Sequence, residues 1–81
     1  MVNFESIATN ILNGTISGVF VLRNGREIES IFFSVNKRRY ASILYPQYPY
    51  MLFGLMYNKN GEVYLLSQQD KSCDIVDFRY N

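Results

Sequence analysis

The acidic side chains come closest to a catalytic or metal-binding arrangement in this 81-residue chain. Glu27 and Glu29 lie two residues apart, so on a strand they share one face, where two carboxylates can couple their protonation. A solvated strand face explains this pair better. Asp70, Asp74 and Asp77 suggest a calcium loop, but they lack the alternating oxygen ligands and the closing bidentate glutamate of such a loop. The carboxylates therefore predict neither an acid–base pair nor a metal site.

The remaining reactive residue types are scarce. The chain has no histidine and a single cysteine, Cys73. Histidine is the commonest general base at neutral pH, and a lone cysteine without it can neither complete a zinc site nor gain its usual activating partner. The glycines form no phosphate-binding cluster. We therefore expect a protein that is not an enzyme and that holds no cofactor and no metal.

Tyrosine is the residue type best suited to recognition here, because it joins a large apolar ring to a polar hydroxyl. The sequence YPQYPY, residues 45–50, places three tyrosines around two prolines. The prolines would either stiffen a binding loop, which lowers the entropy lost on binding, or simply form a stiff corner that prevents strand extension. The residues predicted to contact a partner are Arg38, Arg39, Tyr45, Tyr48 and Tyr50.

The net charge separates two classes of partner. At +1 it is too small for a protein whose affinity comes mainly from neutralising phosphates. A protein partner is therefore the leading hypothesis. The alternative is a small RNA or single-stranded DNA binder, in which the tyrosine loop stacks on bases while Lys37, Arg38 and Arg39 hold the backbone.

The first structural element is a short helix. Apolar residues recur at helical spacing, and Asn3 before them and Asn13-Gly14 after them are typical of a helix start and stop. A helix of this length is marginal alone, so it must pack on a sheet. The apolar stripe is Phe4, Ile7, Ala8, Ile11 and Leu12.

Strand-like segments separated by turn signals follow the helix. Asn24-Gly25 is typical of a two-residue hairpin loop of type I′, here between segments 17–23 and 26–35. Further strands are expected at 39–45, 51–57, 62–67 and 74–80. The predicted fold class is α+β, with a short N-terminal helix, about residues 4–12, packed on an antiparallel meander of about six strands, about residues 15–80. We expect the sheet to be strongly curved or partly barrel-like, in a single domain of residues 1–81.

Both faces of the predicted first hairpin carry large apolar side chains. With a two-residue loop, Val21 lies opposite Ile28. One short helix cannot cover two faces, so the second must be closed by curling, covered by a second copy in a homodimer, or covered by another molecule. The residues predicted for self-association are Phe20, Leu22, Ile31 and Phe33.

The sequence shows no secretory leader and no run long enough for a membrane helix, so we expect a cytoplasmic protein with no membrane partner. Asn, Tyr, Phe, Ile and Lys are plentiful and Ala is scarce, a bias typical of AT-rich phages and mobile elements. The resulting hypothesis is a small binding protein that inhibits or modulates a larger host protein by steric occlusion. A structural subunit with an obligate partner is a third option.

Overall fold

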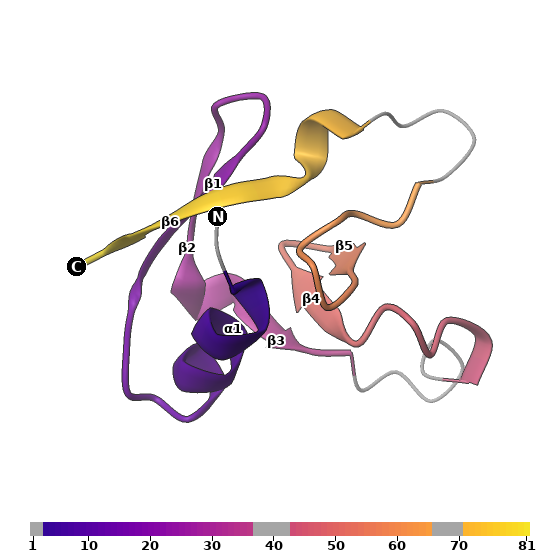
Figure 1. The fold of residues 1–81 in the computed structure, drawn as a ribbon, viewed down its shortest axis with the longest axis horizontal. Coiled ribbons are helices and arrows are strands. Elements are labelled where there is room, and N and C mark those ends of the chain that lie inside the picture. Colours follow the sequence, from indigo (N-terminus) through magenta and orange to yellow (C-terminus); the bar gives the residue numbers. More distant parts are fainter. Residues whose placement is uncertain (1–2, 37–42, 66–70) are drawn as a thin grey trace.

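The computed structural model describes residues 3–36, 43–65 and 71–81. These residues form one helix, six strands and two short 3-10 turns, which confirms the predicted α+β class (Figure 1). The elements are α1 (Phe4–Leu12), β1 (Gly18–Leu22), β2 (Glu27–Glu29), η1 (Ser30–Phe32), β3 (Phe33–Val35), β4 (Tyr50–Leu52), β5 (Leu55–Tyr57), η2 (Lys71–Cys73) and β6 (Ile75–Tyr80).

Helix α1 has the bounds that its apolar spacing predicts. The Ser6 N–H donates to the side-chain oxygen of Asn3 at 3.3 Å, so Asn3 caps the first turn. At the other end, the Gly14 N–H donates to the Ile11 carbonyl at 3.0 Å and closes the helix. Phe4 and Ala8 are buried and fix the helix against the strands.

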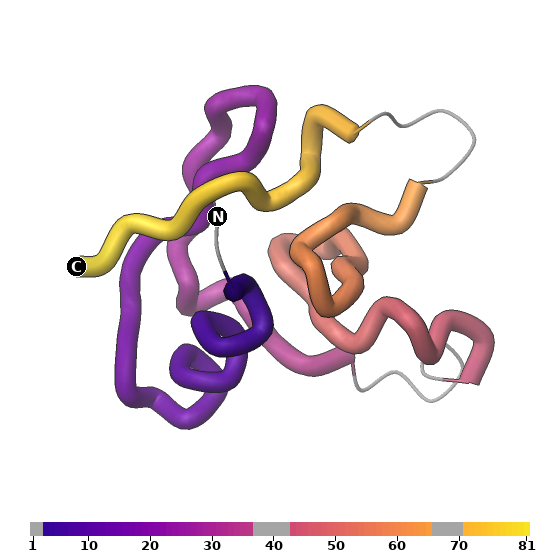
Figure 2. Tube along the Cα trace, in the orientation of Figure 1, coloured from indigo at the N-terminus to yellow at the C-terminus, as the bar shows by residue number. Residues whose placement is uncertain are grey.

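The strands form two antiparallel sheets of three strands each. The first has the order β2-β1-β6 and the second β3-β4-β5. Figure 2 shows the C-terminal segment returning to the first hairpin, where β6 pairs with β1. The predicted simple meander is therefore wrong, and so is the partly barrel-like closure, because the chain leaves the first sheet after β2 and starts a second one.

The loop of the first hairpin has three residues, 23–25, rather than the two predicted. The Leu22 N–H donates to the Arg26 carbonyl at 2.8 Å. Gly25 has a φ of 87°, the left-handed conformation that closes a three-residue loop through a bulge. The Asn-Gly pair thus predicted the hairpin correctly but its loop length incorrectly.

The longer loop shifts the strand pairing by one residue. Phe20 lies opposite Ile28, and both side chains are buried together with Leu22. Glu27 and Glu29 point to the other face and are exposed. The predicted register, which placed apolar side chains on both faces, is therefore wrong because a one-residue shift exchanges the faces of the whole strand.

The segment predicted as one strand over 26–35 is broken by the η1 turn. The Gly18 N–H donates to the Ser30 hydroxyl oxygen at 3.1 Å instead of to a strand carbonyl. This turn carries the chain from the first sheet to the second and leaves Ile31 and Phe32 exposed.

The segment predicted as one buried strand over 51–57 is a tight hairpin. Phe53 has a φ of 49° and Gly54 a φ of 84°, and Leu52 lies opposite Leu55. Positive φ at both loop residues is the signature of a type I′ turn. In the predicted strand 62–67, the part that the structure describes pairs only through the bridge of Tyr57 with Val63. The predicted strand 39–45 lies mostly outside the described residues.

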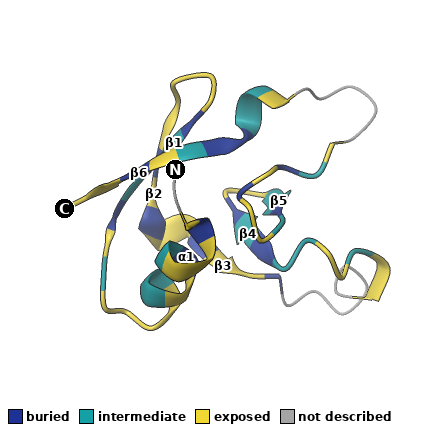
Figure 3. Cartoon of the chain, in the orientation of Figure 1, coloured by how far each residue is buried: buried dark blue, intermediate teal, exposed yellow. Residues whose placement is uncertain are grey.

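A single core lies between the helix and the two sheets (Figure 3). The Phe4 ring packs edge-on against Phe33 and Tyr50, with centroids 6.0 and 5.7 Å away, and Phe20 packs on Phe78 at 5.0 Å. On the outer face of the first sheet, Glu27 of β2 and Arg79 of β6 form an ion pair across β1. None of the helices in the described part of the chain is long and apolar enough to cross a membrane.

Candidate interaction surface

The proline-rich segment 45–50 contains a reverse turn. The Tyr48 N–H donates to the Tyr45 carbonyl at 3.0 Å, with Pro46 at the second turn position, where its fixed φ is favourable. The segment then enters β4 at Tyr50. The corner considered from the sequence is thus present in the structure as a turn.

The three predicted tyrosines do not form one surface. Tyr45 and Tyr48 both pack on Tyr64. Their ring centroids lie 4.8 and 5.1 Å, respectively, from the centroid of the Tyr64 ring. A hydrogen bond with Tyr45, assisted by burial, raises the pKa of Tyr64 above its usual value. Tyr50 instead lies in the core, where burial raises the pKa of its hydroxyl. Arg38 and Arg39, the other predicted contact residues, lie outside the described residues.

Three of the four residues predicted for self-association lie together in the core instead of on an open face. Phe20, Leu22 and Phe33 are buried in the core, whereas Ile31 is 80% exposed on the η1 turn. The grouping of these residues on one open face follows from the incorrect hairpin register. Ile31 is therefore the member of the set that a second molecule can reach.

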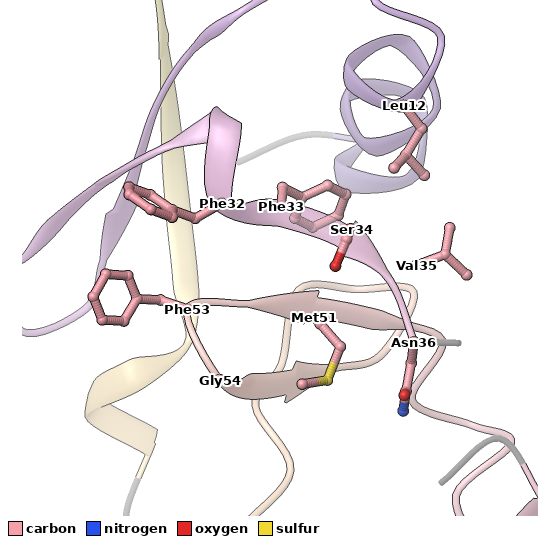
Figure 4. Close-up of a pocket in the computed structure, with 9 residues that line it drawn as sticks. All are labelled: Leu12, Phe32, Phe33, Ser34, Val35, Asn36, Met51, Phe53 and Gly54. Carbon is pink, nitrogen blue, oxygen red and sulfur yellow. The ribbon is translucent and has the colours of Figure 1, made fainter. Parts of the chain in front are cut away.

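A groove that the sequence did not predict runs over the second sheet and has a volume of about 820 Å³. Ser34 and Met51 are paired across β3 and β4 and lie along the groove. Figure 4 shows Phe32 and Phe53 at one end of it, with Leu12 and Val35 toward the other. The nine lining residues are Leu12, Phe32, Phe33, Ser34, Val35, Asn36, Met51, Phe53 and Gly54.

Two turns place the aromatic end of the groove. Phe32 comes from η1 and Phe53 from the β4–β5 turn, and their ring centroids are 5.2 Å apart in an edge-to-face arrangement. Phe32 is 50% and Phe53 54% exposed. The Arg26 guanidinium lies 5.2 Å from the Phe53 centroid, within cation–π range. We call Arg26, Phe32 and Phe53 the aromatic end.

Asn36 marks the opposite end of the groove and is only 5% exposed. Its backbone N–H donates to the Pro49 carbonyl at 2.8 Å, and its side-chain N–H donates to the Tyr48 carbonyl at 3.4 Å. Its side-chain oxygen is buried and has no hydrogen-bond partner within the described ranges. Asn36 thus joins the groove to the tyrosine turn.

The charges around the groove are uneven. Asp74 pairs with Arg23 at 3.5 Å, and Glu27 pairs with Arg79. In the described part of the chain, no carboxylate lies within ion-pair distance of Arg26. Arg26 is therefore an exposed cation without an ion pair in this part of the chain, beside two exposed rings.

Asp74, one of the carboxylates considered for chemistry, is held by contacts within the fold. Asp74 is buried, and its Oδ1 accepts the Val63 N–H at 2.9 Å. Nearby, the buried Tyr57 hydroxyl donates to the Cys73 carbonyl at 2.6 Å, and burial raises the pKa of this tyrosine far above its usual value. Across the residues that the structure describes, no three acidic, cysteine or histidine side chains gather as metal ligands do.

One weak signal of the groove is visible in the sequence. Gly54 interrupts an apolar run, which is compatible with a turn that exposes its neighbour Phe53. Leu12 and Phe32 carry no such signal, because their meeting depends on the path of the chain between the sheets. Comparison with known protein families, curated proteins and solved structures found no match.

Proposed function

We propose that this protein is a non-enzymatic binding protein of the cytoplasm that inhibits or modulates a larger protein by covering part of its surface. The observation that supports the proposal is the apolar groove with two half-exposed phenylalanine rings at one end. Large contiguous apolar patches on soluble domains often mark a surface that binds a partner.

The aromatic end has the composition of a binding hot spot. Such spots are few, central and rich in aromatic and arginine side chains. Covering the exposed half of one phenylalanine ring contributes about 2 kcal/mol, at about 25 cal/mol per Å² of apolar area. Two rings together then set an upper bound of roughly a thousandfold on the change in the dissociation constant, because ordering and desolvation costs reduce the gain from buried area.

The tyrosine turn has a supporting role in this proposal. Tyr45 and Tyr48 already pack on Tyr64, so part of each ring is occupied within the protein. They form a border beside Asn36, which donates to the Tyr48 carbonyl at the end of the groove away from Phe53. A partner seated in the groove contacts this border without having to order it.

The experiment is affinity capture of the tagged protein from a lysate of its host cell, with nuclease treatment of half the sample. The proposal expects one dominant protein that is recovered equally from both halves. Recovery that vanishes with nuclease, together with nucleic acid in the untreated half, would contradict it and favour an RNA or single-stranded DNA binder.

A further inference from the structure

We infer that the groove receives an extended segment of the partner protein in which a carboxylate stands next to apolar side chains, with the carboxylate on Arg26. This inference rests on the proposed function and specifies the chemistry of the partner. It is carried by three observations on the described residues, namely the charge of Arg26, the backbone of Phe53 and the outer position of β3 in its sheet.

Arg26 determines the polar part of the partner. Its guanidinium lies over the Phe53 ring at 5.2 Å, and within the described segments it forms no ion pair with a carboxylate. A guanidinium stacked on a ring still presents its N–H groups at the edge, where a carboxylate can accept two of them. An acidic side chain of the partner fits this place better than a neutral or basic one.

Phe53 is placed at a position that disfavours it. Its φ of 49° is left-handed, a conformation in which asparagine and glycine are strongly preferred and a bulky side chain is unusual. The ring is also more than half exposed, so the core does not explain it. Unfavourable backbone at an exposed aromatic residue is the pattern expected where binding, rather than folding, selects the side chain.

The groove can hold several side chains of such a segment. Its volume of about 820 Å³ lies in the upper part of the range of pockets that enclose ligands. The floor and rim supply apolar contacts from Leu12, Val35 and Met51. The apolar side chains of the partner therefore lie along the groove while its carboxylate lies at the aromatic end.

The edge of β3 favours an extended conformation of the partner. β3 is an outer strand of the second sheet. Because Asn36 hydrogen-bonds to Pro49 of the neighbouring chain segment, the alternation of antiparallel pairs directs the peptide groups of Val35 away from β4. A partner strand can pair with such an edge by strand addition.

The test uses a phage-displayed library of random 12-residue peptides, selected on the immobilised intact protein. The inference expects enriched peptides to share Asp or Glu next to apolar residues. Dissociation constants of the enriched peptides are then measured with wild type, Arg26→Gln and Phe53→Asn. Each substitution is expected to weaken binding by about tenfold or more, since it removes a charge-assisted contact or a hot-spot ring.

Two substitutions serve as matched controls. Lys59→Gln removes an exposed cation outside the groove, and Tyr80→Thr removes an exposed aromatic ring on the first sheet. Both are expected to bind the peptides within about twofold of wild type, as surface changes outside an interface usually do. Phe53→Asn should keep its thermal midpoint, because asparagine tolerates the left-handed turn. If it unfolds, Arg26→Gln alone decides the test.

Three results would overturn the inference. Enriched peptides without an acidic preference, or equal binding to Arg26→Gln, would show that Arg26 does not select the partner. Sedimentation of the wild type as a dimer that Phe53→Asn lacks would show that a second copy covers the groove. Failure to enrich any peptide would overturn the inference while leaving the proposed function open to the capture experiment.

Discussion

The contacts of Asp74 and Tyr57 show that these two buried residues stabilise the fold and do not form a reactive site. Asp74 accepts the Val63 N–H and faces Arg23, and Tyr57 donates to the Cys73 carbonyl. Each contact joins the C-terminal part of the chain to an earlier segment. A polar group without a partner at these places would leave a buried donor or acceptor unsatisfied, which is costly.

Asp74→Ala is expected to lower the free energy of unfolding by about 2 kcal/mol, because it leaves the buried Val63 N–H without an acceptor. The thermal midpoint should then fall by about 10 °C for a domain of this size. Arg23→Ala removes the exposed partner of Asp74 and the hydrogen bond from Arg23 Nε to the Lys71 carbonyl, and it should cost about 1 kcal/mol, because Asp74 keeps its bond from the Val63 N–H. Unfolding of both variants is followed by circular dichroism. Equal losses of unfolding free energy in the two variants would contradict this assignment.

The buried hydroxyl of Tyr57 should make the folded protein less stable at alkaline pH. Burial raises its pKa in the folded protein, whereas in the unfolded chain it stays near the usual 10.0. The folded state therefore holds the proton more tightly, so its stability is full below pH 10 and falls as the pH rises further. Urea midpoints measured from pH 7 to 11 should fall more steeply for wild type than for Tyr57→Phe.

The same series needs a reference for other titrating groups. Tyr80→Phe changes an exposed tyrosine and should keep the wild-type slope. At pH 7, Tyr57→Phe should already cost about 1 kcal/mol through the lost hydrogen bond to Cys73. Parallel slopes for all three proteins would exclude Tyr57 as the source of the alkaline instability.

The elements show how far local sequence signals reach. The bounds of α1 followed from apolar spacing and its caps, because both signals are local. The Asn24-Gly25 pair predicted a hairpin but fits loops of two and of three residues, so it could not fix the register. The Phe53-Gly54 turn was missed because phenylalanine rarely adopts the left-handed backbone that this turn requires.

The pairing of β1 with β6 depends on a close approach at Gly18. A Cβ atom added there would lie 2.0 Å from the Arg79 carbonyl oxygen, which belongs to the backbone and cannot move away alone. Gly18→Ala is therefore expected to cost about 3 kcal/mol, at the upper end of overpacking effects. Ser17→Ala, one residue earlier and exposed, should change stability by no more than about 0.5 kcal/mol.

Denaturant unfolding of both variants measures this difference directly. Amide hydrogen exchange adds a local readout, since Gly18→Ala should increase exchange along β6 more than along β4. A Gly18→Ala protein as stable as wild type would mean that the first sheet does not require the close approach seen between these two strands.

The whole molecule resolves a conflict that the sequence left open. The apolar residues exceed what one helix and one sheet can bury. The chain forms two sheets, which bury these residues in one core. The outer face of the first sheet is spanned by the Glu27–Arg79 ion pair, whereas the second sheet keeps the apolar groove. The groove joins residues far apart in the sequence, so only the topology reveals it.

The apolar groove of the second sheet is the proposed binding surface of the protein. The most direct measurement is quantitative affinity capture with wild type, Phe32→Ser and Tyr80→Thr from the same host lysate, after nuclease treatment, with folding checked by circular dichroism. The groove predicts that Tyr80→Thr recovers the same dominant protein as wild type, while Phe32→Ser recovers at least tenfold less. Equal recovery by folded Phe32→Ser would contradict the claim.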